Sequence, residues 1–141
     1  MGMRRRTFLA AAAASSAAPG IARAANVLKF IPQADITILD PVWTTAYVTR
    51  NHGFLVFDTL YGTDAKFNAT PQMVEGHVVE NDGRQWTLTL RDGLAWHDGG
   101  KVLARDCVAS IRRWGARDAF GGTLLQFSDE IAAVDDRTIR F

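Results

Sequence analysis

The residues best suited to acid–base chemistry are His97 and Asp98, which stand side by side in the run 96–100. A histidine and a carboxylate can act together when their side chains meet a substrate. Adjacent residues in a turn point in different directions, and no serine or cysteine in a nucleophile signature lies nearby. We therefore expect a tight turn in which Asp98 accepts backbone hydrogen bonds while Gly99 and Gly100 take positive φ angles. A hydrolase that uses His97 and Asp98 is the less favoured alternative.

Metal and nucleotide chemistry have little support in the sequence. His52, His77 and His97 are 25 and 20 residues apart, outside any His-Glu-x-x-His or Cys-x-x-Cys pattern. The sequence also lacks a Gly-x-x-x-x-Gly-Lys phosphate loop. Cys107, the single cysteine, cannot form a disulfide within the chain, and its place on an apolar helix face predicts a core position. We expect no catalytic residue, no metal site and no cofactor.

A third group of residues, between positions 43 and 51, fits ligand binding better than catalysis. It combines an aromatic platform, a hydroxyl, an amide and a cation: Trp43, Thr44, Tyr47, Arg50 and Asn51. Aromatic rings offer stiff apolar area, and Arg50 could form a charge-assisted bond to a carboxylate, so the group suits a polar solute with peptide-like groups. The competing interpretation places Trp43 and Tyr47 in the core and Arg50 in a surface ion pair.

Composition indicates a globular chain without a nucleic-acid partner. The 141 residues are 48% hydrophobic and 22% charged, unlike disordered, collagen-like or disulfide-stapled chains. Four of the 16 basic residues lie in the first 24 positions, which hold no acidic residue, so the remaining chain carries 12 basic and 15 acidic side chains, a net charge of −3. A mildly acidic domain lacks the basic surface that an electrostatic nucleic-acid binder needs.

The first 24 residues have the layout of an export signal. Arginines at positions 4–6 form a basic head, positions 8–18 are a short apolar stretch made mostly of alanine, and Ala22 and Ala24 are the small residues that a signal peptidase requires. At about 1.5 Å per residue, the apolar stretch spans roughly half of a hydrocarbon core of about 30 Å, too little for a permanent membrane helix. The alternative is a basic N-terminal helix that stays attached.

The basic head carries a more specific signal. Arg5 and Arg6, followed after one residue by Phe8 and Leu9, resemble the twin-arginine export motif. The weakly hydrophobic alanine stretch and Arg23 near the cleavage position fit the same route. The resemblance implies the twin-arginine export machinery as a partner and a periplasmic location after cleavage.

From residue 25 onward the pattern predicts a mixed α and β domain. The runs 27–31 and 36–39 are short, apolar and closed by a proline, as expected of strands or extended segments. Apolar residues over 47–60 have helical spacing, and Gly62 is expected to end that helix. The segment 61–73 contains turn residues typical of a loose hairpin or loop.

The clearest local signal is a hairpin over 77–90. Two β-prone runs flank Asp82 and Gly83, a pair that favours the tight turn between paired strands. In the second run Trp86, Leu88 and Leu90 alternate with threonines, so we expect all three to face a core.

The C-terminal part reads as a helix followed by short elements. Ala104, Cys107, Val108, Ile111 and Trp114 recur at helical spacing, which predicts an amphipathic helix that ends near Gly115. The remaining expectations are a strand over 94–96, arginines 105, 112 and 113 toward solvent, a short helix over 123–127, and strands over 131–134 and 138–141.

The order of these motifs resembles the N-terminal lobe of the family 5 extracellular solute-binding proteins, the receptors of peptide and nickel ABC importers. The likeness rests on the segments 39–41, 71–76, 81–83, 86–93, 96–99 and 134–141 and on the helix positions 104, 106 and 108–113. It covers nearly all of residues 27–141 and implies an α/β (mixed α+β) fold: a type II-like, two-lobed periplasmic binding protein, incomplete in this chain. Residues 1–24 are then the export signal and 25–141 the truncated N-terminal portion.

The resemblance also implies a function. Such a receptor is not an enzyme; it closes two lobes around a peptide or similar polar solute and delivers it to the importer's permease, while a separate subunit hydrolyses ATP. In the family, the chain after Asp40 and Pro41 enters the cleft between the lobes, which favours residues 43–51 as solute contacts. The identity of the solute stays open. The alternative from another class is a short secreted interaction module that binds no small solute.

Two departures from the family pattern carry structural consequences. The helix over 104–115 begins with Leu103 and Arg105 where the family commonly has threonine and glutamate. This loses a capping acceptor and places a cation at the positive end of the helix, at a cost of about 1–2 kcal/mol that Asp106 partly offsets. Family members are also several times longer, so we expect an unpaired sheet edge near Phe141.

Overall fold

The computed structural model describes residues 29–141. Gln33–Phe141 forms one of two compact units, and it contains all the helices and strands described below. The predicted export signal, with Arg5, Arg6, Phe8 and Leu9 and the cleavage residues Ala22 and Ala24, lies outside the described residues. Within residues 29–141, no helix is long and apolar enough to cross a membrane.

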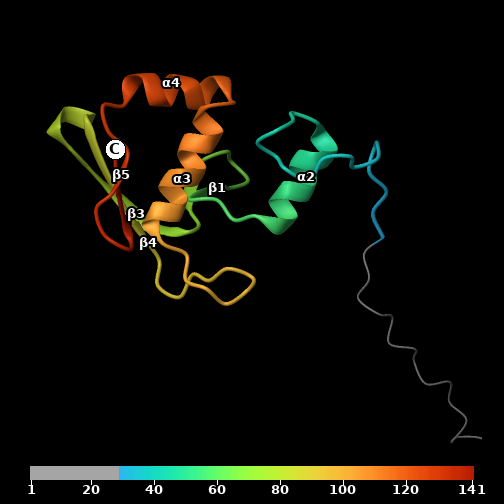
Figure 1. The fold of residues 1–141 in the computed structure, drawn as a ribbon, viewed down its shortest axis with the longest axis horizontal. Coiled ribbons are helices and arrows are strands. Elements are labelled where there is room, and N and C mark those ends of the chain that lie inside the picture. The colour runs from blue at the N-terminus through green and yellow to red at the C-terminus, as the bar shows by residue number, and fades with distance from the viewer. Residues whose placement is uncertain (1–28) are drawn as a thin grey trace, which may run out of the picture. The chain divides into compact units, whose positions relative to one another are not determined.

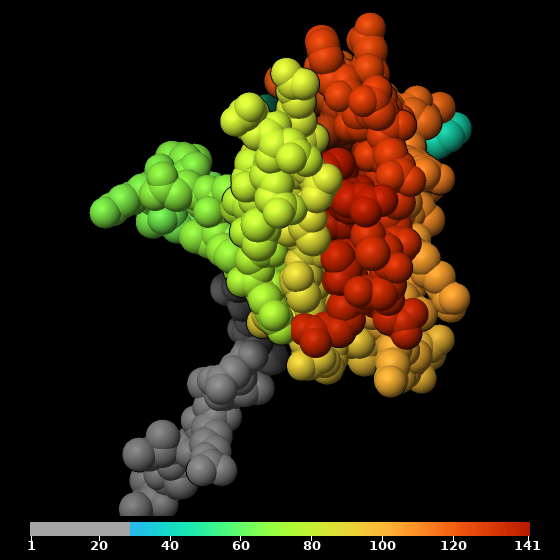
Figure 2. Space-filling model, turned by 90° about the vertical axis from the view of Figure 1, so that its left-hand side faces the viewer, coloured from blue at the N-terminus to red at the C-terminus, as the bar shows by residue number. Residues whose placement is uncertain are grey.

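The main sheet of this unit is four-stranded and antiparallel, and it lies beside the helix α3 (Ala104–Gly115) (Figure 1). In sheet order its strands are β3 (Val74–Glu80), β4 (Gln85–Leu90), β6 (Thr138–Arg140) and β5 (Ala132–Ala133). Figure 2 shows the β3–β4 hairpin lying beside the C-terminal strands. The last strand is therefore an inner one, and the exposed edges are β3 and β5.

The end of the chain differs from the expectation of an unpaired edge near Phe141. Its backbone N–H donates to the Trp86 carbonyl at 2.9 Å, and the Trp86 N–H donates to the Phe141 carbonyl at 2.9 Å. Both backbone groups of Phe141 are thus satisfied by β4, because β6 continues along that strand.

Two helices complete the core. α3 (Ala104–Gly115) packs against the sheet, and α4 (Ala119–Phe127) packs against α3. The buried residues are contributed by the sheet, α3 and the approach to β5: Val74, Leu88, Leu90, Ala104, Cys107, Val108, Ile131 and Ile139. The predicted core position of Cys107 is confirmed, and burial raises the pKa of its thiol, which suppresses the reactive thiolate.

The β3–β4 hairpin confirms the strongest sequence signal. Asn81, Asp82 and Gly83 all have positive φ angles, of 53°, 55° and 84°, as a tight connection between twisted strands requires. Leu88 and Leu90 are buried as predicted, but Trp86 is 42% exposed. The alternation of apolar and polar residues along β4 is intact. Trp86 lies near the turn, where it stacks on His77 and donates from Nε1 to the Gly83 carbonyl at 2.9 Å.

The start of α3 shows how the missing cap is offset. Leu103 has no side-chain acceptor, but its own N–H donates to Asp106 Oδ2 at 3.0 Å. The Ala104 N–H finds the Asp136 carbonyl at 2.8 Å. Two donors near the helix start are therefore satisfied despite the unfavourable Leu103 and Arg105.

α3 and α4 meet at two glycines. A Cβ on Gly121 would lie 2.7 Å from the Gly115 Cα, so only glycine allows the two backbones to approach this closely. Asp118 caps α4 by accepting from the backbone N–H groups of Phe120 at 2.9 Å and Gly121 at 3.1 Å. This cap explains why α4 begins at Ala119, earlier than the predicted start at residue 123.

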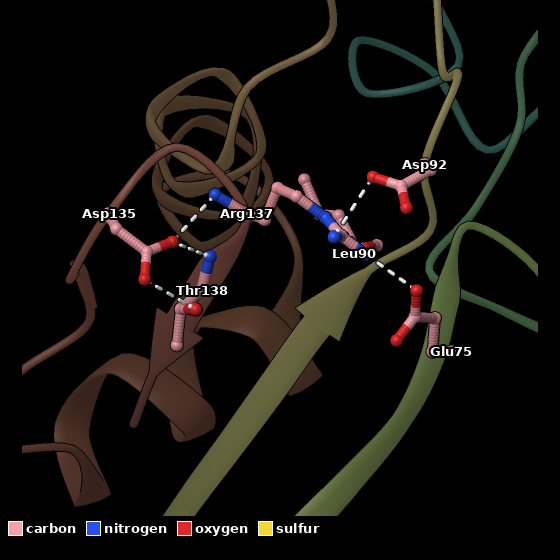
Figure 3. A network of polar contacts seen from close by, with 6 residues as sticks. All are labelled: Glu75, Leu90, Asp92, Asp135, Arg137 and Thr138. Atoms are coloured by element: carbon pink, nitrogen blue, oxygen red, sulfur yellow. Dashed lines mark hydrogen bonds and ion pairs between the residues drawn. The ribbon is translucent and has the colours of Figure 1, made fainter.

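Arg137 ties the ends of three strands together (Figure 3). Its guanidinium donates to the Leu90 carbonyl at 2.6 and 2.9 Å and pairs with Glu75 at 2.5 Å and Asp92 at 2.9 Å. Asp135 holds the adjoining turn by accepting from the Arg137 N–H at 2.8 Å. The motif over 134–141 that carries the family resemblance thus has a structural role.

Two predicted elements before β3 differ from the structure. For residues 36–39 the strand alternative is wrong, because no strand is present within the described residues 29–46. α2 (Tyr47–Val56) ends before Gly62, because Phe57 is already extended, with φ −109° and ψ 136°. Gly62 instead pairs with Thr70 between the two strands β1 (Tyr61–Thr63) and β2 (Ala69–Pro71), which form the expected hairpin.

The predicted strand over 94–96 is reduced to a single bridge between Ala95 and Lys101. The run is too short to pair further because the 97–100 turn follows at once. The strands over 131–134 and 138–141 are present but shorter than predicted, as β5 and β6.

Candidate functional site

The candidate ligand segment follows a tight turn at residues 40–43. Asp40 Oδ1 accepts from the Val42 N–H at 3.0 Å, and the Asp40 carbonyl accepts from the Trp43 N–H at 3.2 Å. Pro41 suits the second position of such a turn because its φ is fixed. Thr44 Oγ1 then accepts from the Ala46 N–H at 3.2 Å, directly before α2. The sequence therefore directs the chain from the turn into the helix.

The buried side of α2 holds the helix against the turn. Thr49, which is 1% exposed, donates from Oγ1 to the Ile38 carbonyl at 2.7 Å. Gly53 lies beneath Pro41, whose Cβ would be 3.3 Å from a Cβ at position 53. These contacts decide which side of α2 faces outward.

The outward side of α2 presents three of the predicted ligand residues. Tyr47, Arg50 and Asn51 are all exposed and share one helix face by their spacing. The Arg50 guanidinium lies 4.3 Å from the centre of the Tyr47 ring, a cation–π geometry. Tyr47 is 57% exposed rather than in the core, and residues 29–141 contain no ion pair to Arg50.

Trp43 and Thr44 lie before the helix and have other neighbours. Trp43 is also 57% exposed, which excludes the core alternative for it, and Thr44 is half-buried. The guanidinium over the Trp43 ring is that of Arg117, at 3.9 Å from the ring centre. The structure thus groups Tyr47, Arg50 and Asn51 on α2 and joins Trp43 to the link between α3 and α4.

Arg113 is the second link between this segment and α3. Its guanidinium donates to both carboxylate oxygens of Asp40, with Nη1 to Oδ1 at 3.2 Å. This bond is the main reason why the pKa of Asp40 is lowered, and the carboxylate in turn raises the pKa of Arg113. The helix pattern correctly placed Arg113 on the exposed side of α3 but missed its partner. An Asp-Pro turn and two arginines four residues apart were the available signals.

His97 and Asp98 form the expected turn. Asp98 Oδ1 accepts from the Gly100 N–H at 2.8 Å, and the Gly99 N–H donates to the Trp96 carbonyl at 2.9 Å. Gly99 has a positive φ of 86°, but the prediction of a positive φ at Gly100 is wrong. Glycine relieves a close contact there, because a Cβ at position 100 would lie 3.1 Å from Asp98 Oδ1.

The remaining histidines have different surroundings. Within residues 29–141, no group of three His, Cys, Asp or Glu side chains could hold a metal ion. His52 Nδ1 is buried on α2 without a hydrogen-bond partner among the described residues. His77 Nδ1 lies 2.6 Å from the Tyr61 hydroxyl.

A groove that sequence reasoning missed lies at the hairpin end of the sheet. This groove of about 1010 Å³ is lined by β4 and the end of α4, and it includes the aromatic group Tyr61, His77 and Trp86. The ring centres of His77 and Trp86 are 5.0 Å apart, and partial burial raises the pKa of Tyr61. His77 and Trp86 meet across the β3–β4 pair, and Tyr61 comes from the separate β1–β2 hairpin, so no linear pattern reveals the group. None of residues 43–51 lines the groove.

Comparison with known sequences gives consistent matches. The profile of the bacterial extracellular solute-binding proteins, family 5 Middle, matches residues 68–141. A probable peptide ABC transporter periplasmic-binding protein, y4tO, of Sinorhizobium fredii is 40% identical over 96% of this chain and 27% of its own length. A dipeptide-binding protein of Lactococcus lactis is 31% identical over 61% of this chain and 16% of its own length. The chain spans about a quarter or less of these relatives.

Solved structures agree on the fold. The binding protein MoaA of A. tumefaciens R10, in complex with mannopinic acid, is 28% identical, with a TM-score of 0.66 over 75% of this chain and 23% of its own. The peptide-bound OppA of Listeria monocytogenes, at 24% identity, has a TM-score of 0.59 over 72% of this chain and 23% of its own. At that identity the second likeness concerns the fold alone.

Proposed function

This chain belongs to the bacterial extracellular solute-binding proteins of family 5, and we propose that it is the N-terminal part of a receptor that captures a peptide or similar polar solute for an ABC importer. The observation that carries the proposal is the likeness to the probable peptide receptor of S. fredii over 96% of this chain. The dipeptide- and glutathione-binding proteins among the relatives support the same solute class. The mixed α+β fold is that of the corresponding part of the two-lobed binding proteins.

The proposed solute contacts are Trp43, Thr44, Tyr47, Arg50 and Asn51. Their support is geometric: the aromatic rings are exposed, and Arg50 is held over Tyr47 by stacking. A stacked guanidinium loses fewer degrees of freedom when a carboxylate binds, so it is partly prepared for a solute with a free carboxylate. Asn51 adds an amide donor and acceptor on the same helix face.

The proposed mechanism is binding followed by delivery. The solute would bind between two lobes, and its binding energy would shift an open–closed equilibrium toward the form that docks on the permease. This scheme requires no catalytic group and no cofactor in this chain. The further proposed features are export by the twin-arginine machinery, cleavage of a signal peptide after residue 24, a periplasmic location and ATP hydrolysis in a separate subunit.

The experiment starts from the native product recovered from the periplasm of the producing bacterium. Its intact mass defines the mature chain, and a tryptophan-fluorescence titration with trialanine and with glutathione measures binding. We expect saturable binding of at least one peptide, weakened about tenfold or more by Arg50→Ala if Arg50 binds the carboxylate. Arg105→Ala, on an exposed face of α3, is the matched control. A native product that binds neither peptide contradicts the proposed function.

A further inference from the structure

Two arginines contact the turn that precedes α2. Arg113 lies in the last turn of α3, which ends at Gly115, and Arg117 lies in the link that follows, two residues beyond that end. Arg113 donates to both oxygens of Asp40, a two-bond geometry that fixes orientation as well as distance. The guanidinium of Arg117 covers the Trp43 ring at 3.9 Å.

The position of Arg117 is set by its backbone. Its N–H and that of Asp118 both donate to the Trp114 carbonyl at 2.9 Å. Asp118 also caps α4, and the close contact of Gly115 with Gly121 fixes the approach of the two helices. The backbone of the residue that contacts Trp43 is therefore held by the junction of α3 and α4.

Asp40 transmits this constraint to α2. One carboxylate oxygen binds both Arg113 and the Val42 N–H, so the ion pair and the turn share an atom. Pro41, the next residue, contacts Gly53 of α2. The hydrogen bond from Thr49 to the Ile38 carbonyl fixes the same helix on the other side of the turn. A displacement of the turn must therefore displace α2.

We propose that Arg113 and Arg117 are positioning residues for the solute site: by fixing the 40–43 turn on α3, they set where α2 presents Tyr47 and Arg50. The inference depends on the proposed function for its binding part only. Exposed ion pairs contribute little to global stability. The expected consequence of losing these contacts is therefore a change in local geometry and affinity, with little change in the unfolding transition.

The first test uses amide hydrogen exchange on the full chain without ligand. Arg113→Met and Arg117→Met remove the charge and keep an unbranched side chain, and Arg105→Met is the matched control at the other end of α3. We expect exchange at the amides of Val42, Trp43 and Arg50 to rise about twofold to fivefold in the first two variants and to stay unchanged in the control. Unchanged exchange in both variants would overturn the proposal.

A double-mutant cycle identifies the partner. Asp40→Asn keeps an acceptor for the Val42 N–H but removes the charge. If Arg113 acts through Asp40, Arg113→Met should add little to the exchange rate in the Asp40→Asn background. Full additivity would contradict the assigned partner. Arg113→Lys should give an intermediate rate, because lysine keeps the charge without the two-bond geometry.

The second test measures the affinity of the native receptor for trialanine. We expect Arg113→Met to weaken binding while the melting temperature stays at the wild-type value, a separation that a general structural defect would not produce. Raised exchange with unchanged affinity would overturn the positioning role. If the wild-type receptor itself fails to bind peptide, the proposed function fails, and raised exchange would still support the contact between the two arginines and the turn.

Discussion

Two regions of this molecule are held in place by different kinds of interaction. The body, residues 61–141, buries apolar side chains between a sheet and α3, with Val74 and Ile139 fully enclosed. The arm, residues 38–57, leaves Phe54 and Leu55 of α2 71% and 84% exposed. Burial dominates the free energy of folding, so the body should determine global stability.

The arm relies on a few directional contacts. These are the Thr49 hydrogen bond to Ile38, the packing of Pro41 on Gly53, and the contacts of Arg113 in α3 and Arg117 in the link after it. A region with few buried apolar contacts opens locally at low free-energy cost, and ligand-binding elements are commonly of this kind. The proposed binding segment is therefore oriented by its contacts with the body but is not buried against it.

The largest expected contrast comes from the same substitution in each region. Leu90→Ala removes a side chain that is 1% exposed and should lower the free energy of unfolding by about 2–5 kcal/mol. Leu55→Ala in the arm should change it by no more than about 0.5 kcal/mol. Urea denaturation followed by circular dichroism measures both. Similar losses for the two variants would mean that the arm shares the core of the body.

A second comparison concerns two glycines of α4 that lie near α3. In Gly121→Ala the new methyl group would lie 2.7 Å from the Gly115 Cα, so we expect a loss of about 1–3 kcal/mol despite the better helix propensity of alanine. The control is Gly122→Ala, whose Cβ would meet nothing closer than the Gly115 carbonyl at 3.6 Å, and which should gain up to about 1 kcal/mol. Thermal unfolding distinguishes the two signs.

A substitution confined to the arm should leave the body intact. Thr49→Val removes the donor to the Ile38 carbonyl and should reduce the local stability of α2 by about 1 kcal/mol. We expect faster exchange of the α2 amides and no change in the β3–β4 amides, measured by hydrogen exchange. Thr45→Val, at an exposed position, should alter neither. Faster exchange in both regions would show that arm and body unfold together.

Acidification should act on the two regions through different carboxylates. The pKa of Asp135 is lowered, first by the Arg137 N–H, and that of Asp40 is lowered, first by Arg113. A carboxylate with a lowered pKa in the folded state stabilises it at neutral pH, and this contribution is lost as the pH falls below about 4.

We therefore expect Asp135→Asn to flatten the acid side of the unfolding free-energy curve below about pH 5. Asp40→Asn should leave that curve unchanged and flatten only the pH dependence of exchange in the arm. Urea denaturation and exchange at several pH values provide the two curves. A global effect of Asp40→Asn would contradict the separation of the two regions.

Sequence periodicity predicts the body better than the arm. Residues that share one helix face or one strand face, as in α3 and β4, are set by local geometry, and their pattern is visible in the sequence. The hairpin turn at Asp82 and Gly83 follows from its backbone requirement. The candidate ligand residues Tyr47, Arg50 and Asn51 share a face of α2 because of the same helical spacing.

The contacts that the sequence does not reveal join residues that are far apart along the chain. Asp40 and Arg113 meet only after α3 and the turn are in place, and no local spacing relates them. Trp86 continues the apolar alternation of β4, but whether it is covered depends on how far the helices extend over the sheet. Gly62 could end a helix or occupy a strand, and its pairing with Thr70 decides between them.

The order of strands in the sheet has a consequence for folding kinetics. β3 and β4 are neighbours in sequence and can pair within microseconds, but β4 meets its other partner, β6, only near the end of the described chain. Pairing Leu88 with Ile139 requires closure of a long loop that contains α3 and α4. During synthesis, the edge of β4 that later pairs with β6 therefore stays unpaired while both helices emerge, and an unpaired strand edge is open to aggregation.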